Sequence, residues 1–286
     1  MRIIRADAMG MCFGVRDALE VAWQVRRPEE TTVLGELVHN EVVIDRMRQR
    51  GFRMVAEDRA VPPTTREVLV TAHGISDRER RALRFDGKEL IDTTCPLVTR
   101  AHDAALALEA DDRHVIVIGR PGHVEVRGLI GDLRAATVVA GPAQVRSYPH
   151  ARLGVLCQTT VPEQHAADTL AAIRAANPDA DVHFVDTVCE PTKARTRAAR
   201  ELAGRCDLVV VVGGRNSNNT AQLVMICRSA GAQTYHVQGP DDLRTRWFAD
   251  TMTVGITAGT STLGSTVDRI ETRLERIAEQ LAVRPA

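Results

Sequence analysis

Short runs of β-branched and other apolar residues recur along the chain, separated by longer segments that mix apolar and polar residues with helical spacing. Runs that are apolar throughout are typical of strands buried on both faces of a parallel sheet. We predict strands at residues 2–4, 32–34, 68–71, 90–92, 114–118, 153–156, 182–185, 208–212 and 252–256. We predict helices at residues 14–27, 97–109, 162–176, 192–204, 220–230 and 265–281. This alternation of strands and helices indicates an α/β protein.

Many of the predicted strands run into a loop of small residues that also carries a polar or imidazole side chain. These side chains are His39, His73, His123, Thr159, Ser217 and Ser261. In open parallel sheets, ligands bind beyond the carboxyl ends of the strands, where such loops gather. We therefore expect the loops to form one polar binding site.

The loops repeat in pairs, and each of the first two pairs is followed by a strand that ends in a related tetrad. The tetrads are Asp92-Thr-Thr-Cys95 and Asp186-Thr-Val-Cys189. The third pair of loops has no cysteine after it, but Cys12 follows the predicted N-terminal strand. If that strand completes the third unit, three α/β units of similar size each contribute one cysteine.

This repeat predicts three α/β domains related by a pseudo-threefold axis. Their expected bounds are residues 13–95, residues 96–187, and residues 188–270 together with 1–12, followed by a C-terminal helix and tail at 271–286.

Composition narrows the classes of function. The chain of 286 residues has 37 Lys and Arg against 37 Asp and Glu, and only 3% aromatic residues. A basic excess and aromatic stacking platforms mark nucleic-acid-binding proteins, so we expect no nucleic-acid partner. No apolar run reaches the roughly 20 residues that span a membrane, and the N-terminus lacks a secretory signal, so we expect a cytoplasmic protein with no membrane partner.

Cysteines in a reducing compartment are metal ligands or reactive groups more often than disulfide halves. Cys12, Cys95 and Cys189 each lie between a predicted strand and the start of a helix, where the helix dipole favours the thiolate. Three thiolates from three domains point to a metal site. Structural zinc sites usually use four ligands with close pairs such as C-x2-C, which this chain lacks. An iron–sulfur cluster fits better, because three cysteines leave a fourth iron open to substrate.

The other three cysteines have different settings. Cys206 and Cys227 lie in helix-like or strand-entry surroundings and are expected to be packed structural thiols. Cys157 precedes Gln158-Thr159-Thr160 at a strand end, and we favour packing for it as well. His102, His114, His150, His165, His183 and His236 match no loop motif and are interpreted as surface or packing residues.

Eight segments together resemble the LytB family of 4-hydroxy-3-methylbut-2-enyl diphosphate reductases, and they occur in the family's order from about residue 1 to residue 265. They are Met11-Cys12-Phe-Gly-Val15, Leu37-Val-His39-Asn40, Thr71-Ala-His73-Gly74, Asp92-Thr-Thr-Cys95-Pro-Leu-Val98, Gly122-His123-Val-Glu125-Val126, Gln158-Thr159-Thr160, Asn216-Ser217 and Ala258-Gly-Thr-Ser261. Any one of these segments would be weak evidence, whereas eight in order are specific.

The resemblance implies a three-domain α/β fold around a central 4Fe–4S cluster held by Cys12, Cys95 and Cys189. It also implies a reductive dehydroxylation in the methylerythritol phosphate route to isoprenoids. Two electrons and two protons remove the allylic hydroxyl of the diphosphate substrate as water, which yields isopentenyl and dimethylallyl diphosphate. A ferredoxin or flavodoxin is the electron donor that the resemblance implies.

The resemblance further assigns roles to single residues. Glu125 corresponds to the proton-relay acid, and Thr159 corresponds to the residue that touches the substrate hydroxyl. The resemblance places His123 beside the diphosphate, and we include it among the expected catalytic residues. The implied diphosphate ligands are His39, His73, His123, Ser217, Asn218, Asn219 and Ser261. Hydroxyl, amide and imidazole donors on glycine-flanked loops suit an anion of this kind.

Four positions depart from the family pattern. In the segment after His123, Val124 replaces a proline, and Arg127 stands later in the same segment. Asn218 replaces a hydroxyl residue, and Thr196 replaces a glutamine. These changes leave two alternatives open: a family paralogue that reduces another allylic or phosphorylated hydroxyl compound in secondary metabolism, or a cluster-containing sensor without turnover.

One basic segment stands outside these motifs. The arginines at 195, 197, 200 and 205 lie on one predicted helix, and we interpret them as a solvated face, with a basic patch for an acidic electron donor as the alternative.

Overall fold

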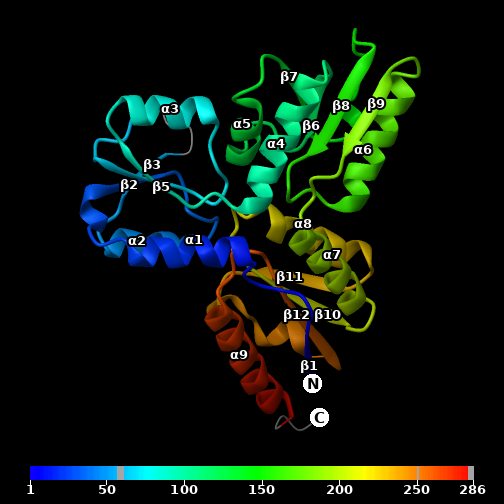
Figure 1. Cartoon of the computed structure of the whole chain (residues 1–286). Coiled ribbons are helices and arrows are strands. Elements are labelled where there is room, and N and C mark those ends of the chain that lie inside the picture. Colours follow the sequence, from blue (N-terminus) through cyan, green and yellow to red (C-terminus); the bar gives the residue numbers. More distant parts are fainter. Residues whose placement is uncertain (57–60, 250, 283–286) are drawn as a thin grey trace. The chain divides into compact units, whose positions relative to one another are not determined.

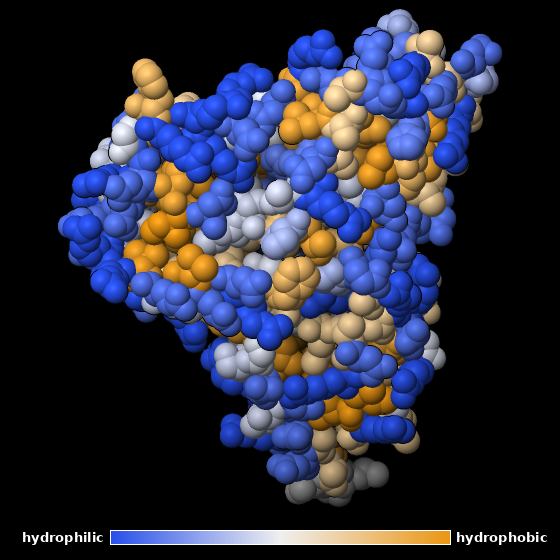
Figure 2. All heavy atoms as spheres, in the orientation of Figure 1, coloured by the Kyte–Doolittle hydropathy of each residue, from blue (hydrophilic) through white to orange (hydrophobic). Residues whose placement is uncertain are grey.

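The structure, a computed structural model, describes residues 1–56, 61–249 and 251–282. It is an α/β protein with three parallel four-stranded sheets (Figure 1), so the predicted fold class is confirmed. On the face drawn in Figure 2, apolar residues lie in separate patches between hydrophilic ones. Within the described part of the chain, no helix is both long and apolar enough to cross a membrane.

The first sheet has the strand order β3-β2-β4-β5, with all neighbours parallel. Its strands are β2 (Thr31–Leu34), β3 (Arg53–Val55), β4 (Glu67–Val70) and β5 (Glu89–Asp92). The helices in this part of the chain are α1 (Phe13–Gln24), α2 (Glu41–Gln49) and α3 (Asp77–Phe85), with a short 3-10 turn, η1 (Pro28–Glu30).

The second sheet has the order β7-β6-β8-β9, again all parallel. Its strands are β6 (His114–Ile118), β7 (Ala136–Val139), β8 (Arg152–Cys157) and β9 (Asp181–Val185). The helices are α4 (Pro96–Ala110), α5 (Val124–Ile130) and α6 (Glu163–Ala176), with the 3-10 turn η2 (Pro142–Gln144).

The third sheet has the order β1-β12-β10-β11. Its strands are β10 (Leu208–Val212), β11 (Gln233–Val237), β12 (Thr253–Ala258) and the N-terminal β1 (Arg2–Arg5). Because β1 pairs in parallel with β12, with Ile3 opposite Val254, the prediction that the N-terminal strand completes the last unit is confirmed. The helices are α7 (Glu190–Ala203), α8 (Asn218–Ser229) and α9 (Gly264–Ala282), with the turns η3 (Pro240–Asp242) and η4 (Thr245–Phe248).

All three sheets share one topology. If β1 is counted as the fourth strand of its sheet, the spatial order in each is second, first, third and fourth. The first and third strands are therefore central neighbours, and the chain leaves them in opposite directions. This is the topological switch point at which α/β proteins bind ligands, just beyond the carboxyl ends of the strands.

The strand β10 shows why the buried runs are apolar throughout. Val209 and Val211 pack on one side of the sheet with Leu202 of α7, whereas Val210 and Val212 pack on the other with Ile270 of α9. Since helices cover both faces, no position along this strand is left for a polar side chain.

Every predicted strand and helix has a counterpart in the structure, but six further elements were not predicted. The strands are β3, β7 and β11, which form one edge of each sheet and are partly exposed. The helices are α2, α3 and α5. Helix α3 buries only Leu83 and is defined by its cap, in which the Ser76 side chain accepts from the Glu79 amide. The segment after His123, expected to be a turn, is helix α5.

By its internal contacts the chain divides into two compact units. Unit 1 contains Met1–Cys12, His39–Glu41 and the chain from Glu190 onward, and unit 2 contains Phe13–Val38 and Val42–Cys189. Unit 1 thus holds the third sheet, and unit 2 holds the first two. The three-domain boundaries stay a prediction, and residues 283–286 of the expected C-terminal tail lie outside the described residues.

Candidate functional site

Three cysteines occupy the same local position in the three sheets. Cys12, Cys95 and Cys189 each stand immediately before a helix, which is α1, α4 and α7 respectively. Each cysteine amide donates to a carbonyl oxygen in the loop after the neighbouring third strand: Cys12 to Thr260 at 3.2 Å, Cys95 to Ala72 at 3.0 Å and Cys189 to Thr159 at 2.9 Å. The predicted placement between strand and helix is confirmed.

The two tetrads hold their cysteines by the same bonds. Asp92 Oδ1 accepts from the Thr94 amide at 3.0 Å, and Asp186 Oδ1 accepts from the Val188 amide at 3.0 Å. These are Asx turns, in which the side chain replaces a backbone acceptor. Arg80 of α3 supports the first tetrad by donating to Asp92 Oδ2 at 2.8 Å, and this pairing lowers the pKa of the Asp92 carboxyl group.

The threonine that follows each aspartate bonds its tetrad to the neighbouring strand of the sheet. Thr93 Oγ1 donates to the Val70 carbonyl at the end of β4, and Thr187 Oγ1 donates to the Cys157 carbonyl at the end of β8. The sequence Asp-Thr-x-Cys therefore encodes a rigid strand exit that presents the cysteine at the carboxyl edge of the sheet.

Burial separates the six cysteines into two sets. Cys12, Cys95 and Cys189 are partly exposed, whereas Cys157, Cys206 and Cys227 are buried. Burial raises the pKa of the Cys206 thiol and raises that of Cys227 to about 11, so both are neutral thiols at physiological pH. The prediction that the second set is packed structural thiols is confirmed.

A glycine lies in close contact with one of the partly exposed cysteines. A Cβ atom at Gly14, in the first turn of α1, would lie 2.4 Å from Cys95 Sγ, so a side chain there would displace the thiol. Among the described residues, no three His, Cys, Asp or Glu side chains converge as they would around a single metal ion. The cysteines of a cubane cluster bind different irons and need not converge on one point. Three partly exposed cysteines are ligands of the kind that hold an iron–sulfur cluster.

Unit 2 joins two of the predicted catalytic residues to one of these cysteines. Glu125, only 2% exposed, accepts from the Thr159 amide through Oε1 at 2.7 Å. The Thr159 carbonyl in turn accepts from the Cys189 amide at 2.9 Å. His123 caps the N-terminus of α5, and its Nδ1 accepts from the Glu125 amide at 3.2 Å. A buried carboxyl group and a cysteine are thus both bonded to the backbone of one residue, Thr159.

His73 and His123 are also close together within unit 2. Their rings meet edge to face, with centroids 5.6 Å apart. They come from different sheets, because His73 follows β4 and His123 follows β6. Val124, where the family has a proline, is the first residue of α5, a position that tolerates either residue because its amide needs no partner within the helix.

Unit 1 assembles the other predicted ligands. Ser261 Oγ donates to the His39 carbonyl at 2.9 Å, and Asn40 Nδ2 donates to the Ser261 carbonyl at 2.6 Å. Asn219 Oδ1 accepts from the Thr260 amide at 3.0 Å, and Ser217 caps α8 by accepting from the Thr220 amide. Asn218 is the first residue of that helix. The N-terminus of α8 therefore lies beside the loops of His39 and Ser261, as an anion site requires.

Two glycines make this approach of α8 feasible. A Cβ atom at Gly213 would lie 2.3 Å from Thr220 Oγ1, and one at Gly259 would lie 2.2 Å from the same atom. Thr220 Oγ1 is buried and has no hydrogen-bond partner among the described residues. Any larger residue at either glycine would push the helix away from the loops.

Sequence reasoning missed two arginines that organise these loops. Arg80 was given no role, and Arg195 was expected on a solvated face. Arg195 is in fact only 6% exposed, and its guanidinium group donates to the Gly10 and Pro191 carbonyls. Arg195 is one of several arginines on the same helix, and nothing in the local sequence distinguishes it from those that are exposed to solvent.

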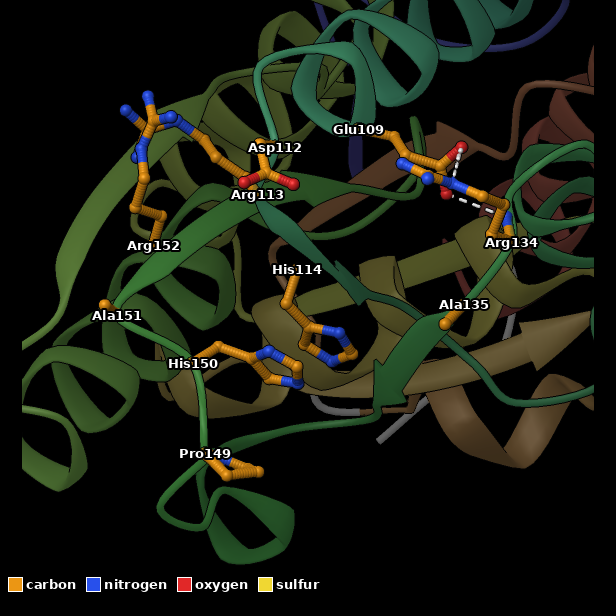
Figure 3. A pocket seen from close by; sticks show the side chains of 10 residues that line it. All are labelled: Glu109, Asp112, Arg113, His114, Arg134, Ala135, Pro149, His150, Ala151 and Arg152. Carbon is orange, nitrogen blue, oxygen red and sulfur yellow. Dashed lines mark hydrogen bonds and ion pairs between the residues drawn. The ribbon is translucent and has the colours of Figure 1, made fainter.

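A pocket with a volume of about 530 Å³ lies elsewhere. Figure 3 shows its lining, in which the parallel rings of His114 and His150 stack with centroids 4.2 Å apart. His114 and Arg152 begin β6 and β8, so this pocket is at the amino edge of the second sheet, opposite Glu125 and Thr159. The interpretation of His114 and His150 as packing residues agrees with the stack.

The fold and these residues define a class of protein: a parallel α/β protein with three topologically equivalent sheets, each presenting a cysteine and polar loops at its carboxyl edge. A family model described as LytB protein matches residues 3–275. A 4-hydroxy-3-methylbut-2-enyl diphosphate reductase of Aquifex aeolicus is 32% identical over 285 residues, covering 97% of both chains. The chain belongs to the LytB family.

Two solved structures of such reductases are similar to this chain. A structure described as (E)-4-hydroxy-3-methyl-but-2-enyl diphosphate reductase, the terminal enzyme of the non-mevalonate pathway, matches with a TM-score of 0.67 and 28% identity, over 96% of this chain and 100% of that one. The E-1-hydroxy-2-methyl-but-2-enyl-4-diphosphate reductase of Plasmodium falciparum shares the fold with a TM-score of 0.84 at 23% identity, over 99% of this chain and 89% of that one.

Proposed function

We propose that this protein reduces 4-hydroxy-3-methylbut-2-enyl diphosphate to isopentenyl and dimethylallyl diphosphate. The allylic C–O bond breaks, two electrons and two protons enter, and the hydroxyl leaves as water. The observation that carries the proposal is the connected series Glu125, Thr159 and Cys189, in which the Thr159 backbone bonds through its amide to the proposed proton donor and through its carbonyl to a proposed cluster ligand. Family membership and the length of the match support it.

We propose Cys12, Cys95 and Cys189 as the ligands of a 4Fe–4S cluster, and a ferredoxin or flavodoxin as the electron donor. When bound, the cluster supplies the electrons and the Lewis acidity that weaken the C–O bond. The partial exposure of these three cysteines and the missing side chain at Gly14 support the assignment.

The protein's own side chains divide the remaining tasks. Glu125 holds the proton that leaves with the hydroxyl, and its bond to the Thr159 amide fixes the direction of the carboxyl group. Thr159 orients the substrate hydroxyl with its side chain. The diphosphate ligands are His39, His73, His123, Ser217, Asn218, Asn219 and Ser261, together with the N-terminal amides of α8.

An assay of anaerobically reconstituted protein with this substrate and a chemical reductant tests the proposal. We expect a thiolate-to-iron absorption band and formation of both products. Replacing Cys12, Cys95 or Cys189 by Ala should abolish the band and the bound iron, whereas Cys206→Ala should retain both, because that thiol is buried and outside the site. An intact cluster without turnover would contradict the proposed reaction, and bound iron that survives all three substitutions would contradict the proposed ligands.

A further inference from the structure

The three cysteine-bearing loops are not fixed in the same way. Cys95 and Cys189 follow an Asx turn made by a carboxylate within their own tetrad, Asp92 or Asp186. The residues immediately before Cys12 are Met9, Gly10 and Met11, none of which can make such a turn. The Cys12 loop needs another source of rigidity.

The Arg195 side chain bonds to the Cys12 loop, which lacks an Asx turn. Its Nε and Nη2 donate to the Gly10 carbonyl oxygen at 2.9 and 2.6 Å, and its Nη1 donates to the Pro191 carbonyl at 2.8 Å. The residue is 6% exposed, so water does not compete for these acceptors and the charge-assisted bonds are strong. Gly10 has a φ of 69°, a left-handed conformation that glycine adopts without strain.

The two carbonyl groups that Arg195 bonds lie close in sequence to two proposed ligands. Gly10 is two residues before Cys12, and Pro191 is two residues after Cys189. The Pro191 bond lies within α7 and anchors the guanidinium group on its own helix, while Asp186 independently holds the turn before Cys189. The planar fork of the guanidinium group allows these bonds, because a single ammonium group cannot place two donors on one carbonyl and a third on another in a fixed geometry.

We infer that Arg195 is a positioning residue that fixes the Cys12 loop for cluster binding, in place of the Asx turn that fixes Cys95 and Cys189. The inference rests on the proposed function, since it assigns Cys12 to the cluster. Loss of Arg195 should free the Cys12 loop selectively and leave the other two cysteine loops in place. Groups that orient metal ligands typically change metal affinity by about 10- to 100-fold when removed.

Alkylation of the cluster-free protein by iodoacetamide, followed by mass spectrometry, measures the loops without relying on activity. In Arg195→Gln we expect Cys12 to react about tenfold faster than in the wild type, with Cys95 and Cys189 unchanged. Asp186→Ala should do the reverse and accelerate Cys189 alone. Arg200→Gln, an exposed position on the same helix, is the matched control and should react like the wild type.

The rate of iron loss to a chelator from the reconstituted protein gives a second readout. It should rise about tenfold in Arg195→Gln and less in Arg195→Lys, which keeps the charge and part of the bonding. Unchanged Cys12 reactivity overturns the inference, as does equal acceleration at all three cysteines, which would indicate general destabilisation. If Arg195→Gln does not fold, Arg195→Lys decides by the same criteria. A wild-type protein that binds no iron contradicts the proposed function, while the alkylation rates still decide the role of Arg195.

Discussion

The second sheet carries histidines at both edges, but the two edges differ in how their polar side chains are bonded. At the carboxyl edge, His123, Glu125 and Thr159 are bonded to backbone groups, and Glu125 is nearly inaccessible to water. At the amino edge, the 530 Å³ pocket is lined by charges that pair with acids at the same edge, such as Arg134 with Glu109 (Figure 3). The bonded series of predicted site residues lies at the carboxyl edge, whereas the amino edge carries surface ion pairs.

This contrast has a physical basis. Paired charges near the surface cancel each other's fields and are screened by water, so they contribute little to binding or catalysis. A buried carboxyl group held by a peptide N–H keeps its orientation and acts in a medium of low dielectric constant. Bonds between buried groups and the backbone distinguish the carboxyl edge from the amino edge.

The largest expected effect comes from exchanging one atom at the carboxyl edge. Glu125→Gln keeps an Oε1 acceptor for the Thr159 amide but cannot deliver a proton, so turnover should fall by about 10²- to 10⁴-fold. The absorption spectrum of the cluster should stay unchanged. The matched variant at the amino edge, His150→Gln, should keep turnover near that of the wild type. Equal losses in the two variants would remove the distinction between the edges.

A smaller and more local effect is expected at the carboxyl edge of the first sheet. In Gly14→Ala the new methyl group would lie 2.4 Å from Cys95 Sγ, so the cysteine or α1 must shift. We expect less bound iron per protein and faster iron loss, although all three cysteines remain. Gly264→Ala, where no atom lies within 4 Å of the new Cβ, is the control and should bind iron normally. Normal iron content in Gly14→Ala would show that Cys95 tolerates displacement.

The sequence was sufficient to predict the central strands and the position of each cysteine between a strand and a helix. Runs such as 208–212 are apolar because helices cover both faces, and the tetrads ending in Cys95 and Cys189 encode their own turns through Asp92 and Asp186. In these cases a local pattern determines the structure. The position of β1 beside β12 is a long-range pairing, and it was predicted from the repeat, because the third unit lacked a cysteine and the N-terminal strand supplied one.

What could not be predicted depends on contacts between distant segments. The edge strands β3, β7 and β11 were missed, although β1, β5 and β9 at the opposite edges are as exposed and were predicted, so exposure alone does not explain the difference. Arg195 resembles its exposed neighbours Arg197 and Arg200 in sequence, and only the fold brings it to Gly10. The bond between Glu125 and the Thr159 amide spans 34 residues and has no signal in either motif alone.

The smallest expected effect concerns the stability of the amino edge. Burial, and next the neighbouring His150, lower the pKa of His114, so the folded protein keeps this ring neutral at pH values where the unfolded chain protonates it. The unfolded state then binds more protons, and the free energy of unfolding should decrease as the pH falls below about 6.5. His114→Gln should reduce this pH dependence, measured by urea unfolding between about pH 7.5 and 5.5. His183→Gln, at an exposed site on β9, should not. If both variants show the same pH dependence as the wild type, the titration of His114 makes no contribution to the pH dependence of stability.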